Sequence, residues 1–277
     1  IMLKSEIKKL STDFGKEEEN DYKIIQLKEI KETKLAKGKP TGFNFIDEKL
    51  QGGLREGDLA IISGLSGNGK SLLTLQMIKN YSAQKIPVLI FSFEEPIDRI
   101  KWRLSEMGAD DNILCFTPKK LKSGHVSWLE EKILDGISHY GIKVIAIDNL
   151  DFLTAERKLN SDDKWSIQSR IVAMLKRVSI ENKITIILNA HVKKLDNTQP
   201  KMEDLYGSGD TYKLADFVLF IHRTREEGVS GEKVLSNKSN LIIEKNRLNG
   251  MCGVQTIYFR DNLFHEEDIG DGWQKDV

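Results

Sequence analysis

Residues 64–71 read Gly64-Leu65-Ser66-Gly67-Asn68-Gly69-Lys70-Ser71, which fits the GxxxxGK[ST] pattern of a phosphate-binding loop. The apolar segment Leu59–Ser63 precedes it with the composition of a strand, and Lys70–Gln84 follows with that of a helix. There the glycines let several backbone N–H groups converge on phosphate oxygens, and the helix N-terminus adds positive potential. We therefore expect a nucleoside triphosphate to bind, with Lys70 neutralising phosphate charge and Ser71 binding Mg²⁺. The predicted nucleotide-binding residues of this segment are Gly64, Leu65, Ser66, Gly67, Asn68, Gly69, Lys70, Ser71 and Leu72.

Three further predicted strands end in polar side chains that suit nucleotide hydrolysis. The apolar run Val144–Asp148 ends in a carboxylate, so Asp148 is predicted to contact the magnesium ion. The segment Phe91–Pro96 places Glu94 at the end of another strand, where a carboxylate can orient and polarise the attacking water. His191 ends a third apolar run and is predicted to sense the γ-phosphate. Sheets of this kind place their ligands at the carboxyl ends of the strands, where these residues stand.

Short runs rich in Val, Ile and Leu alternate with helical segments from Asp58 onward, which predicts an α/β fold: a mainly parallel sheet flanked by helices. The predicted strands are Leu59–Ser63, Val88–Phe93, Lys143–Asp148, Ile184–Ala190, Phe217–His222, Leu241–Asn246 and Val254–Phe259. The predicted helices are Lys70–Gln84, Pro96–Met107, Val126–Tyr140 and Asp163–Asn182. Glu226–Asn240 is a polar, glycine-containing stretch between strands, and Asn249-Gly250 predicts the tight turn of a C-terminal β-hairpin. The acidic segment Glu266–Val277 is expected to be mobile.

The composition limits the location and partners of the protein. The chain has 277 residues, two cysteines and a formal net charge of zero. No apolar run approaches the ~18 residues of a membrane span, so no membrane contact is expected. The cysteine count favours a reducing, cytoplasmic setting. A neutral composition argues mildly against a nucleic-acid partner, although a local basic strip would escape this test.

Two domains are predicted. Residues 1–35 are rich in charge, and apolar residues within Asp21–Lys34 have helical spacing. We interpret this segment as a linker whose amphipathic helix docks on a neighbouring subunit, with a solvated tail as the alternative. Residues 36–277 are predicted to form the second domain, which contains the phosphate-binding loop.

Several segments resemble, in the same order, the motor domain of DnaB-type replicative DNA helicases. They are Pro40-Thr41-Gly42-Phe43, Gly52-Gly53-Leu54, Gly57-Asp58-Leu59, Phe91–Pro96, Asp204–Gly209, Ala215-Asp216, Phe217–Arg223 and Ile243–Arg247 with Gly250. The similarity runs from about Lys39 to Phe259. The phosphate-binding loop alone is shared by many families, whereas the hairpin at Ile243–Arg247 combined with the Glu94 segment is more selective.

The sequence also departs from the bacterial pattern of that family. His191 stands where many bacterial members carry Gln, which is closer to the phage and mitochondrial primase-helicase branch. Tyr206-Gly207 replaces an Arg-Glu pair that contacts DNA in bacterial members. The DNA contact would then come from backbone N–H groups or nearby lysines.

The resemblance implies a RecA-like P-loop NTPase that hydrolyses ATP, or another NTP or dNTP, with Mg²⁺ at subunit interfaces of a homo-oligomeric, hexameric ring. Such a ring translocates on single-stranded DNA and unwinds the duplex, and its partners include a primase and a helicase loader. The resemblance also implies that Lys245 and Arg247 act in trans on the neighbouring nucleotide, Arg247 as an arginine finger. Arg223 is a further candidate phosphate contact. The setting implied is a bacterial or phage-infected cell rather than a mitochondrion.

Two loops, Thr154–Lys164 and Lys193–Ser208, carry basic residues that could line the pore of a ring. Contacts to phosphates would give tight salt dependence and little sequence preference. Gly207 and Gly209 would permit the backbone to approach a phosphate closely. The predicted DNA-binding residues are Lys193, Lys194, Lys201, Gly207 and Gly209.

Two other functions stay open. The first is a non-motor, RecA-like ATP-binding regulator similar to circadian-clock and recombination-mediator ATPases. Such proteins share the Thr-Gly and Gly-Gly pairs, here Thr41-Gly42 and Gly52-Gly53, and the phosphate-binding loop. A recombinase filament is the second alternative. The hairpin that carries Lys245 and Arg247 favours the helicase.

Lys70→Ala is predicted to abolish nucleotide binding, because the phosphate charge then lacks its neutralising ammonium group. Titration with a fluorescent ATP analogue measures this directly. Retention of ordinary affinity in the variant would exclude residues 64–71 as the phosphate-binding loop.

Overall fold

The computed structural model describes residues 26, 35–110, 112–118, 125–154, 161–192, 199–201, 204, 209–227 and 231–267. The helix predicted within Asp21–Lys34, and with it the docking function of residues 1–35, lies outside the described residues apart from Gln26 and Leu35. The compact unit that contains the predicted site runs from Lys37 onward.

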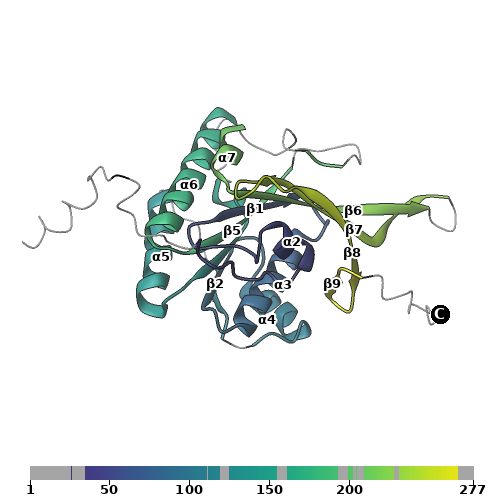
Figure 1. The fold of residues 1–277 in the computed structure, drawn as a ribbon, viewed down its shortest axis with the longest axis horizontal. Helices are drawn as coiled ribbons and strands as arrows, with labels where there is room; N and C mark the ends of the chain where they lie inside the picture. The colour runs from purple at the N-terminus through teal and green to yellow at the C-terminus, as the bar shows by residue number, and fades with distance from the viewer. Residues whose placement is uncertain are drawn as a thin grey trace, which may run out of the picture. The chain divides into compact units, whose positions relative to one another are not determined.

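The described part of this unit is built on one nine-stranded sheet with the order β3-β2-β4-β5-β1-β6-β7-β8-β9 (Figure 1). Strands β1 to β6 form a parallel set, and β7, β8 and β9 continue the sheet in antiparallel pairs. The strands are β1 Leu59–Gly64, β2 Val88–Ser92, β3 Leu114–Phe116, β4 Val144–Asp148, β5 Thr185–His191, β6 Phe217–Glu227, β7 Lys233–Asn246, β8 Gly253–Arg260 and β9 Leu263–His265. The predicted mainly parallel α/β fold is confirmed.

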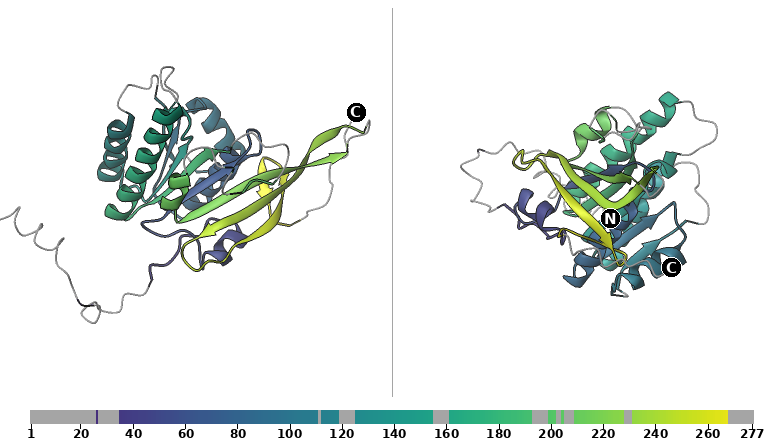
Figure 2. Two further views of the ribbon diagram at one scale, coloured as in Figure 1. Left: turned by 90° about the horizontal axis from the view of Figure 1, so that it is seen from above. Right: turned by 90° about the vertical axis from the view of Figure 1, so that its right-hand side faces the viewer.

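Helices cover both faces of the sheet (Figure 2). They are α2 Asn44–Lys49, α3 Lys70–Ala83, α4 Ile97–Glu106, α5 His125–Tyr140, α6 Ser161–Glu181 and α7 Gly209–Leu214. Alternate residues of β1 serve the two layers: Leu59 and Ile61 pack with α5 and α6, whereas Ala60 and Ile62 pack with α3. This two-sided burial explains why the central strands are continuous apolar runs. Within the described residues, no helix is both long and apolar enough to cross a bilayer.

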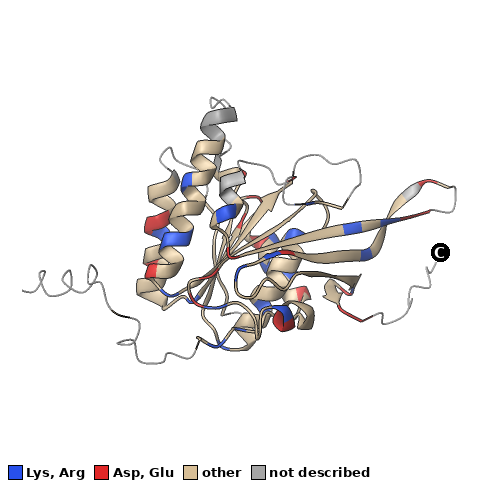
Figure 3. Cartoon of the chain, turned by 45° about the horizontal axis from the view of Figure 1, so that its top comes forward, with Lys and Arg blue, Asp and Glu red and all other residues tan. Residues whose placement is uncertain are grey.

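The stretch Glu226–Asn240, which was not predicted as strand, lies largely within β6 and β7. Residues 223–227 and 233–240 form a hairpin, here called the β6–β7 arm, that projects from the sheet and carries charged residues on both strands (Figure 3). Polar side chains reinforce its ladder: Thr224 Oγ1 donates to the carbonyl of Lys238 at 3.0 Å, and Ser236 Oγ bonds Glu226. Because no described residue of the arm belongs to the apolar core on either face of the sheet, its strands lack the apolar alternation on which the prediction depended.

The tight turn predicted at Asn249-Gly250 is wrong. β7 ends at Asn246 and β8 begins at Gly253, so residues 247–252 form a longer connection. The amide of Asn246 fixes this connection by donating to Asn249 Oδ1 at 2.8 Å and to the carbonyl of Met251 at 3.0 Å. A buried side chain, rather than the intrinsic preference of Asn-Gly, therefore sets the turn.

The first residues of the segment expected to be mobile are tied to the fold. Glu266 accepts hydrogen bonds from the backbone N–H groups of Asn44 and Phe45, both at 2.7 Å, and so binds the start of α2. In front of it, β9 is held to α3 by two bonds between the Gln76 side chain and the backbone of Phe264, at 2.8 and 2.9 Å. The prediction of mobility is therefore wrong for Glu266, and residues 268–277 lie outside the described part.

Candidate nucleotide site

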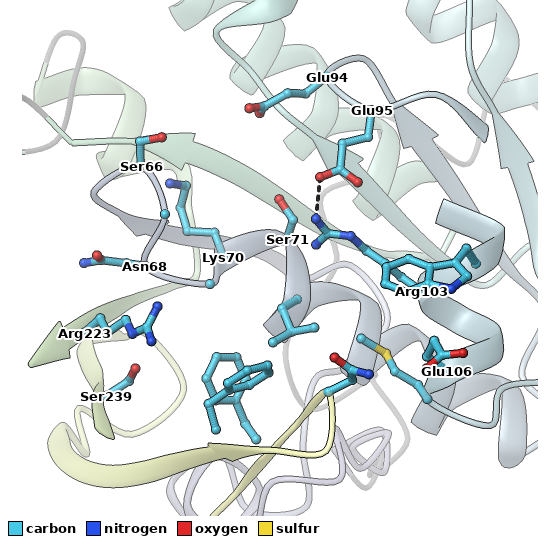
Figure 4. A pocket seen from close by; sticks show the side chains of 18 of the residues that line it. Ser66, Asn68, Lys70, Ser71, Glu94, Glu95, Arg103, Glu106, Arg223 and Ser239 are labelled. Atoms are coloured by element: carbon cyan, nitrogen blue, oxygen red, sulfur yellow. Dashed lines mark ion pairs between the residues drawn. The ribbon is translucent and has the colours of Figure 1, made fainter. Parts of the chain in front are cut away.

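A cavity of about 410 Å³ opens at the edge of the sheet where β1, β2 and β5 end (Figure 4). Its lining comes from the phosphate-binding loop, α4, the ends of β2 and β5, and the β8–β9 hairpin. The lining residues are Ser66, Gly67, Asn68, Gly69, Lys70, Ser71, Leu72, Glu94, Glu95, Trp102, Arg103, Glu106, Met107, His191, Arg223, Ser239, Phe259, Asn262 and Phe264. The structure thus brings most of the predicted nucleotide-binding residues to one cavity.

Lys70 is a buried ammonium group at the floor of this cavity. Its Nζ donates to the carbonyl oxygens of Gly64 and Leu65 at 2.9 and 3.1 Å. Burial lowers the pKa of Lys70, and the nearby Asp148 and Glu94 oppose that shift. A desolvated cation facing an open cavity is a favourable partner for an anion such as a phosphate.

The loop conformation depends on glycine at Gly67 and Gly69, whose φ angles are +79° and +98°. Other L-residues rarely adopt such angles. At Gly69 a Cβ would also lie 2.7 Å from Cζ of Phe264. Gly69 therefore lets the aromatic ring from β9 pack directly against the start of α3.

Asn149 connects the predicted catalytic base to the predicted sensor. Its Nδ2 donates to Glu94 Oε2 at 2.5 Å and lies 3.2 Å from Nε2 of His191. Because an amide nitrogen only donates, Nε2 of His191 accepts this bond and the imidazole is neutral. Burial and then Lys70 lower the pKa of His191, which also favours the neutral ring. Sequence reasoning gave Asn149 no role, although it directly follows Asp148.

Asp148 provides an oxygen that suits a metal ion. The residue is buried, and its Oδ1 has no hydrogen-bond partner among the described residues. Leaving a buried carboxylate oxygen without a partner is costly, so the position fits a cation or a cation-bound water. The described residues contain no cluster of three or more His, Cys, Asp or Glu that could hold a metal. Mg²⁺ is usually held by one or two protein oxygens together with phosphates and water, and Asp148 and Ser71 are the residues that could hold it.

Part of the cavity is lined by apolar and aromatic side chains that were not predicted as site residues. Trp102 comes from α4 and Met107 directly follows that helix, whereas Phe259 and Phe264 come from β8 and β9. The two phenylalanine rings lie 5.7 Å apart at 61°. Such a surface suits the flat face of a nucleobase. The signal for it was Asp261-Asn262 between two apolar runs, since both residues adopt positive φ, as in a tight hairpin turn.

Three charged side chains, Glu95, Arg103 and Arg223, also line the cavity. Glu95 bonds Arg103 of α4 at 2.9 Å, which fixes α4 beside the phosphate-binding loop (Figure 4). Arg223 stands at the base of the β6–β7 arm, and its Nε donates to the carbonyl of Ser236 at 2.5 Å. Its guanidinium group points into the cavity (Figure 4), where the sequence analysis predicted a phosphate contact.

Lys245 and Arg247, here called the cation pair, do not join this cavity. The backbone N–H of Arg247 donates to the carbonyl of Asp216, and the N–H of Asp216 donates to the carbonyl of Leu59, both at 2.9 Å. Leu59 begins β1, and Gly64 ends it beside the phosphate-binding loop. At ~3.3 Å per residue the two ends of this strand are roughly 16 Å apart. The cation pair therefore lies at the opposite edge of the sheet from the Lys70 of its own chain.

The predicted DNA-binding residues are only partly described. Lys193, Lys194 and Gly207 lie outside the described residues, Lys201 is exposed, and Gly209 is the first residue of α7. The structure therefore shows no common surface for these residues.

Comparison with known proteins adds independent information. A family model described as AAA domain matches residues 46–197. The replicative DNA helicase DnaB of Mycoplasma pneumoniae is 24% identical over 251 residues, which cover 76% of this chain and 53% of that protein. The DNA repair protein RadA of Campylobacter jejuni is 29% identical over 155 residues, which cover 56% of this chain and 33% of that protein. The chain thus spans about half the length of the DnaB relative that it matches.

Two solved structures share the fold at 20% sequence identity. One is described as the structure of a DnaB-like replicative helicase and its interactions with primase; the match covers 84% of this chain and 64% of that chain, with a TM-score of 0.68. The other, described as the ATPase domain of G40P, covers 93% of this chain and 96% of that chain, with a TM-score of 0.66. At this identity the likeness establishes the fold alone.

We predict that Asn149→Ala lowers the turnover of nucleotide by roughly 10- to 100-fold, because both Glu94 and His191 lose the bond that orients them. The KM should change little, since Asn149 does not line the cavity. Steady-state ATPase kinetics test this, with Asn182→Ala at the end of α6 as the control that loses an amide elsewhere. Unchanged turnover in Asn149→Ala would show that this amide has no part in hydrolysis.

Proposed function

This chain belongs to the AAA domain family, and from that premise we propose that it is the ATP-hydrolysing motor domain of a DnaB-type replicative DNA helicase. The observation that carries the proposal is the division of the predicted machinery between two edges of one sheet. Lys70, Glu94 and His191 line one cavity, whereas the cation pair lies roughly 16 Å away along β1. A site that uses both sets requires two copies of the chain.

Within one copy, the cavity supports binding and activation. Backbone N–H groups of the phosphate-binding loop and Lys70 bind the β- and γ-phosphates, and the aromatic part of the cavity binds the base. Ser71 and Asp148 would hold Mg²⁺, which would neutralise charge that develops on the phosphates. Glu94 orients the attacking water and accepts its proton, while Asn149 keeps the carboxylate in place.

His191 is well placed to report on the γ-phosphate. It lines the cavity, and its backbone N–H donates to Asp151 Oδ2 at 3.3 Å. The neutral imidazole can respond to a nearby phosphate without carrying a charge of its own. Because Val192 and the segment after it follow His191 directly, a change at the phosphate can reach the predicted DNA-binding loop.

The neighbouring copy would complete the site. The guanidinium group of Arg247 is about half exposed, so it can reach another molecule. Placed beside the γ-phosphate of an adjacent copy, it would stabilise charge on the transferred phosphoryl group, and Lys245 would assist. This arrangement repeats head to tail and closes into a ring, which we propose to be hexameric.

A ring of this kind would act on single-stranded DNA in its pore. We assign the DNA contacts to Lys193, Lys194, Lys201, Gly207 and Gly209. The lysines would form a local basic strip although the chain as a whole has zero net charge. Primase and a helicase loader are the proposed partners in the bacterial or phage-infected cytoplasm. In support, a DnaB-like helicase of the same fold is described together with its interactions with primase.

The regulator and the recombinase are less favoured. The RadA relative matches 56% of this chain and a circadian clock oscillator protein KaiC matches 53%, whereas the DnaB relatives match 76% and 82%. The share of this chain that matches DnaB is therefore larger, by roughly a quarter of the chain's length, than the share that matches RadA or KaiC. A DNA-insensitive ATPase that stays monomeric would favour the regulator.

The proposed function is tested by ATPase assays with and without single-stranded DNA, together with light scattering to detect rings. We expect DNA to stimulate turnover in an assembled ring. Glu94→Ala should retain nucleotide binding but lose roughly 10²- to 10⁴-fold in turnover. The exposed Glu267→Ala is the matched control that removes a carboxylate away from the cavity. If the protein is monomeric and DNA does not change its turnover, the helicase proposal fails. If Glu94→Ala still hydrolyses ATP robustly, Glu94 is not the catalytic base.

Arg247→Ala should bind nucleotide normally and lose roughly 10³- to 10⁵-fold in turnover, because it removes the trans cation and leaves the cavity intact. Mixed with unmodified protein, it should lower activity below the weighted mean of the two preparations if the sites of a ring hydrolyse in turn, since one disabled site then stops the whole ring. Arg177→Ala, which removes another exposed arginine, is the control. Arg247→Ala mixed with Lys70→Ala, each inactive alone, should regain activity, and no gain in that mixture would contradict action in trans.

A further inference from the structure

We propose that Asp216 positions Arg247 for its action on the neighbouring nucleotide. This inference rests on the proposed function. It gives a positioning role to a residue that would touch neither substrate nor metal. Asp216 lies between α7 and β6, at the edge of the sheet opposite the cavity. In the sequence, Ala215-Asp216 stands out only as part of the resemblance to DnaB-type helicases.

The carboxylate of Asp216 is held rigidly. Its Oδ2 accepts a hydrogen bond from the backbone N–H of Leu59 at 2.8 Å and another from Lys176 Nζ at 2.6 Å. The backbone of Asp216 also donates to Leu59 and accepts from Arg247, both at 2.9 Å. The Asp216 side chain is 13% exposed, so this is a fixed, largely buried charge rather than a mobile surface carboxylate.

The second carboxylate oxygen faces the finger. Oδ1 of Asp216 lies 3.7 Å from Nη1 of Arg247, while Nη2 of Arg247 donates to the carbonyl of Lys213 at the end of α7. Arg247 is 49% exposed, in contrast to the carboxylate that faces it. The ion pair is therefore close enough to direct the guanidinium group and too long for a strong hydrogen bond. A guanidinium fork held in this way keeps its orientation and can still exchange a partner for a phosphate.

The same carboxylate also influences the second member of the cation pair. Lys245 Nζ donates to the carbonyls of Tyr212 and Lys213, at 2.6 and 3.1 Å. Burial and then Arg247 lower the pKa of Lys245, and Asp216 opposes that shift. Asp216 is thus a shared counter-charge that lets two cations stand side by side at this edge.

A purely structural role for Asp216 makes a different prediction. Its bond to Lys176 is a largely buried ion pair, and breaking such a pair from either side destabilises a fold. If stability were the only role, Lys176→Met and Asp216→Asn would have the same consequences. If Asp216 positions Arg247, only the loss of Asp216 affects the neighbouring site.

The experiment mixes two kinds of subunit so that only one kind of interface is active. Acceptor subunits carry Arg247→Ala and keep an intact cavity. Donor subunits carry Lys70→Ala and keep an intact cation pair, so they cannot hydrolyse ATP themselves. Turnover in the mixture then reports the action of donor Arg247 on the acceptor's nucleotide.

We expect donors with Asp216 to restore turnover, and donors that also carry Asp216→Asn to restore roughly 10- to 100-fold less, with the KM of the acceptor site unchanged. Asn keeps the size of the side chain and an oxygen for the N–H of Leu59. Donors carrying Lys176→Met should restore turnover as well as unmodified donors. The donor double variant Asp216→Asn/Lys176→Met removes both members of the buried pair, so it keeps the fold without an uncompensated charge, and it should restore as little as Asp216→Asn.

Three results would overturn the inference. Equal restoration by donors with Asp216 and Asp216→Asn would show that the carboxylate does not position the finger. Equal loss with Lys176→Met and Asp216→Asn would assign Asp216 to stability alone. If donors with an intact Asp216 restore nothing, Arg247 does not act in trans, and the assignment of the cation pair under the proposed function fails as well.

Discussion

Strand β1 is the constraint on which the rest of the structure depends. It is buried along its whole length, and each of its ends is hydrogen-bonded to a residue with a predicted or proposed functional role. At its carboxyl end the carbonyl of Gly64 accepts a hydrogen bond from Lys70. At its amino end the carbonyl of Leu59 accepts from the backbone N–H of Asp216, the N–H of Leu59 donates to the Asp216 carboxylate, and the carbonyl of Asp216 accepts from the N–H of Arg247. A strand cannot shorten, so the phosphate-binding loop and the cation pair are kept roughly 16 Å apart in every copy of the chain. A composite site is then available only between copies.

The same sheet explains how polar and charged side chains gather at one edge. Parallel strands deliver Glu94, Asp148 and His191 to one edge from three separate parts of the chain. Their side chains are not independent, because Asn149 bonds two of them and Lys70 influences the pKa of His191. An anionic ligand would therefore encounter the buried cation of Lys70 and the N–H groups of the phosphate-binding loop, while the carboxylates would face the attacking water and the metal ion. Such an arrangement is preorganised, which is how sites of this kind stabilise charge that develops during phosphoryl transfer.

Prediction succeeded where burial on both faces made the sequence signal strong. The central strands and the four longer helices were found within one or two residues, because they carry continuous apolar runs or a clear helical period. The β6–β7 arm was missed because it projects from the core and has no apolar face. The strands β3 and β9 and the short helix α7 were missed because three to six residues contain too little periodicity to read. The apolar part of the cavity was missed for the related reason that its residues come from β8, β9 and α4 with the residue after it, which are remote in sequence.

The sequence by itself determined the phosphate-binding loop, the carboxylates and histidine that end neighbouring strands, and the α/β order. Each of these depends on local rules: glycine conformation, strand and helix periodicity, and the shared direction of parallel strands. Only the tertiary structure decided which groups meet. It paired Asn149 with Glu94 and His191, set Phe264 against Gly69, and separated the cation pair from Lys70 of the same chain. These are contacts between residues far apart in sequence, and a chain pattern carries no distance across a sheet until the strands have been placed in register.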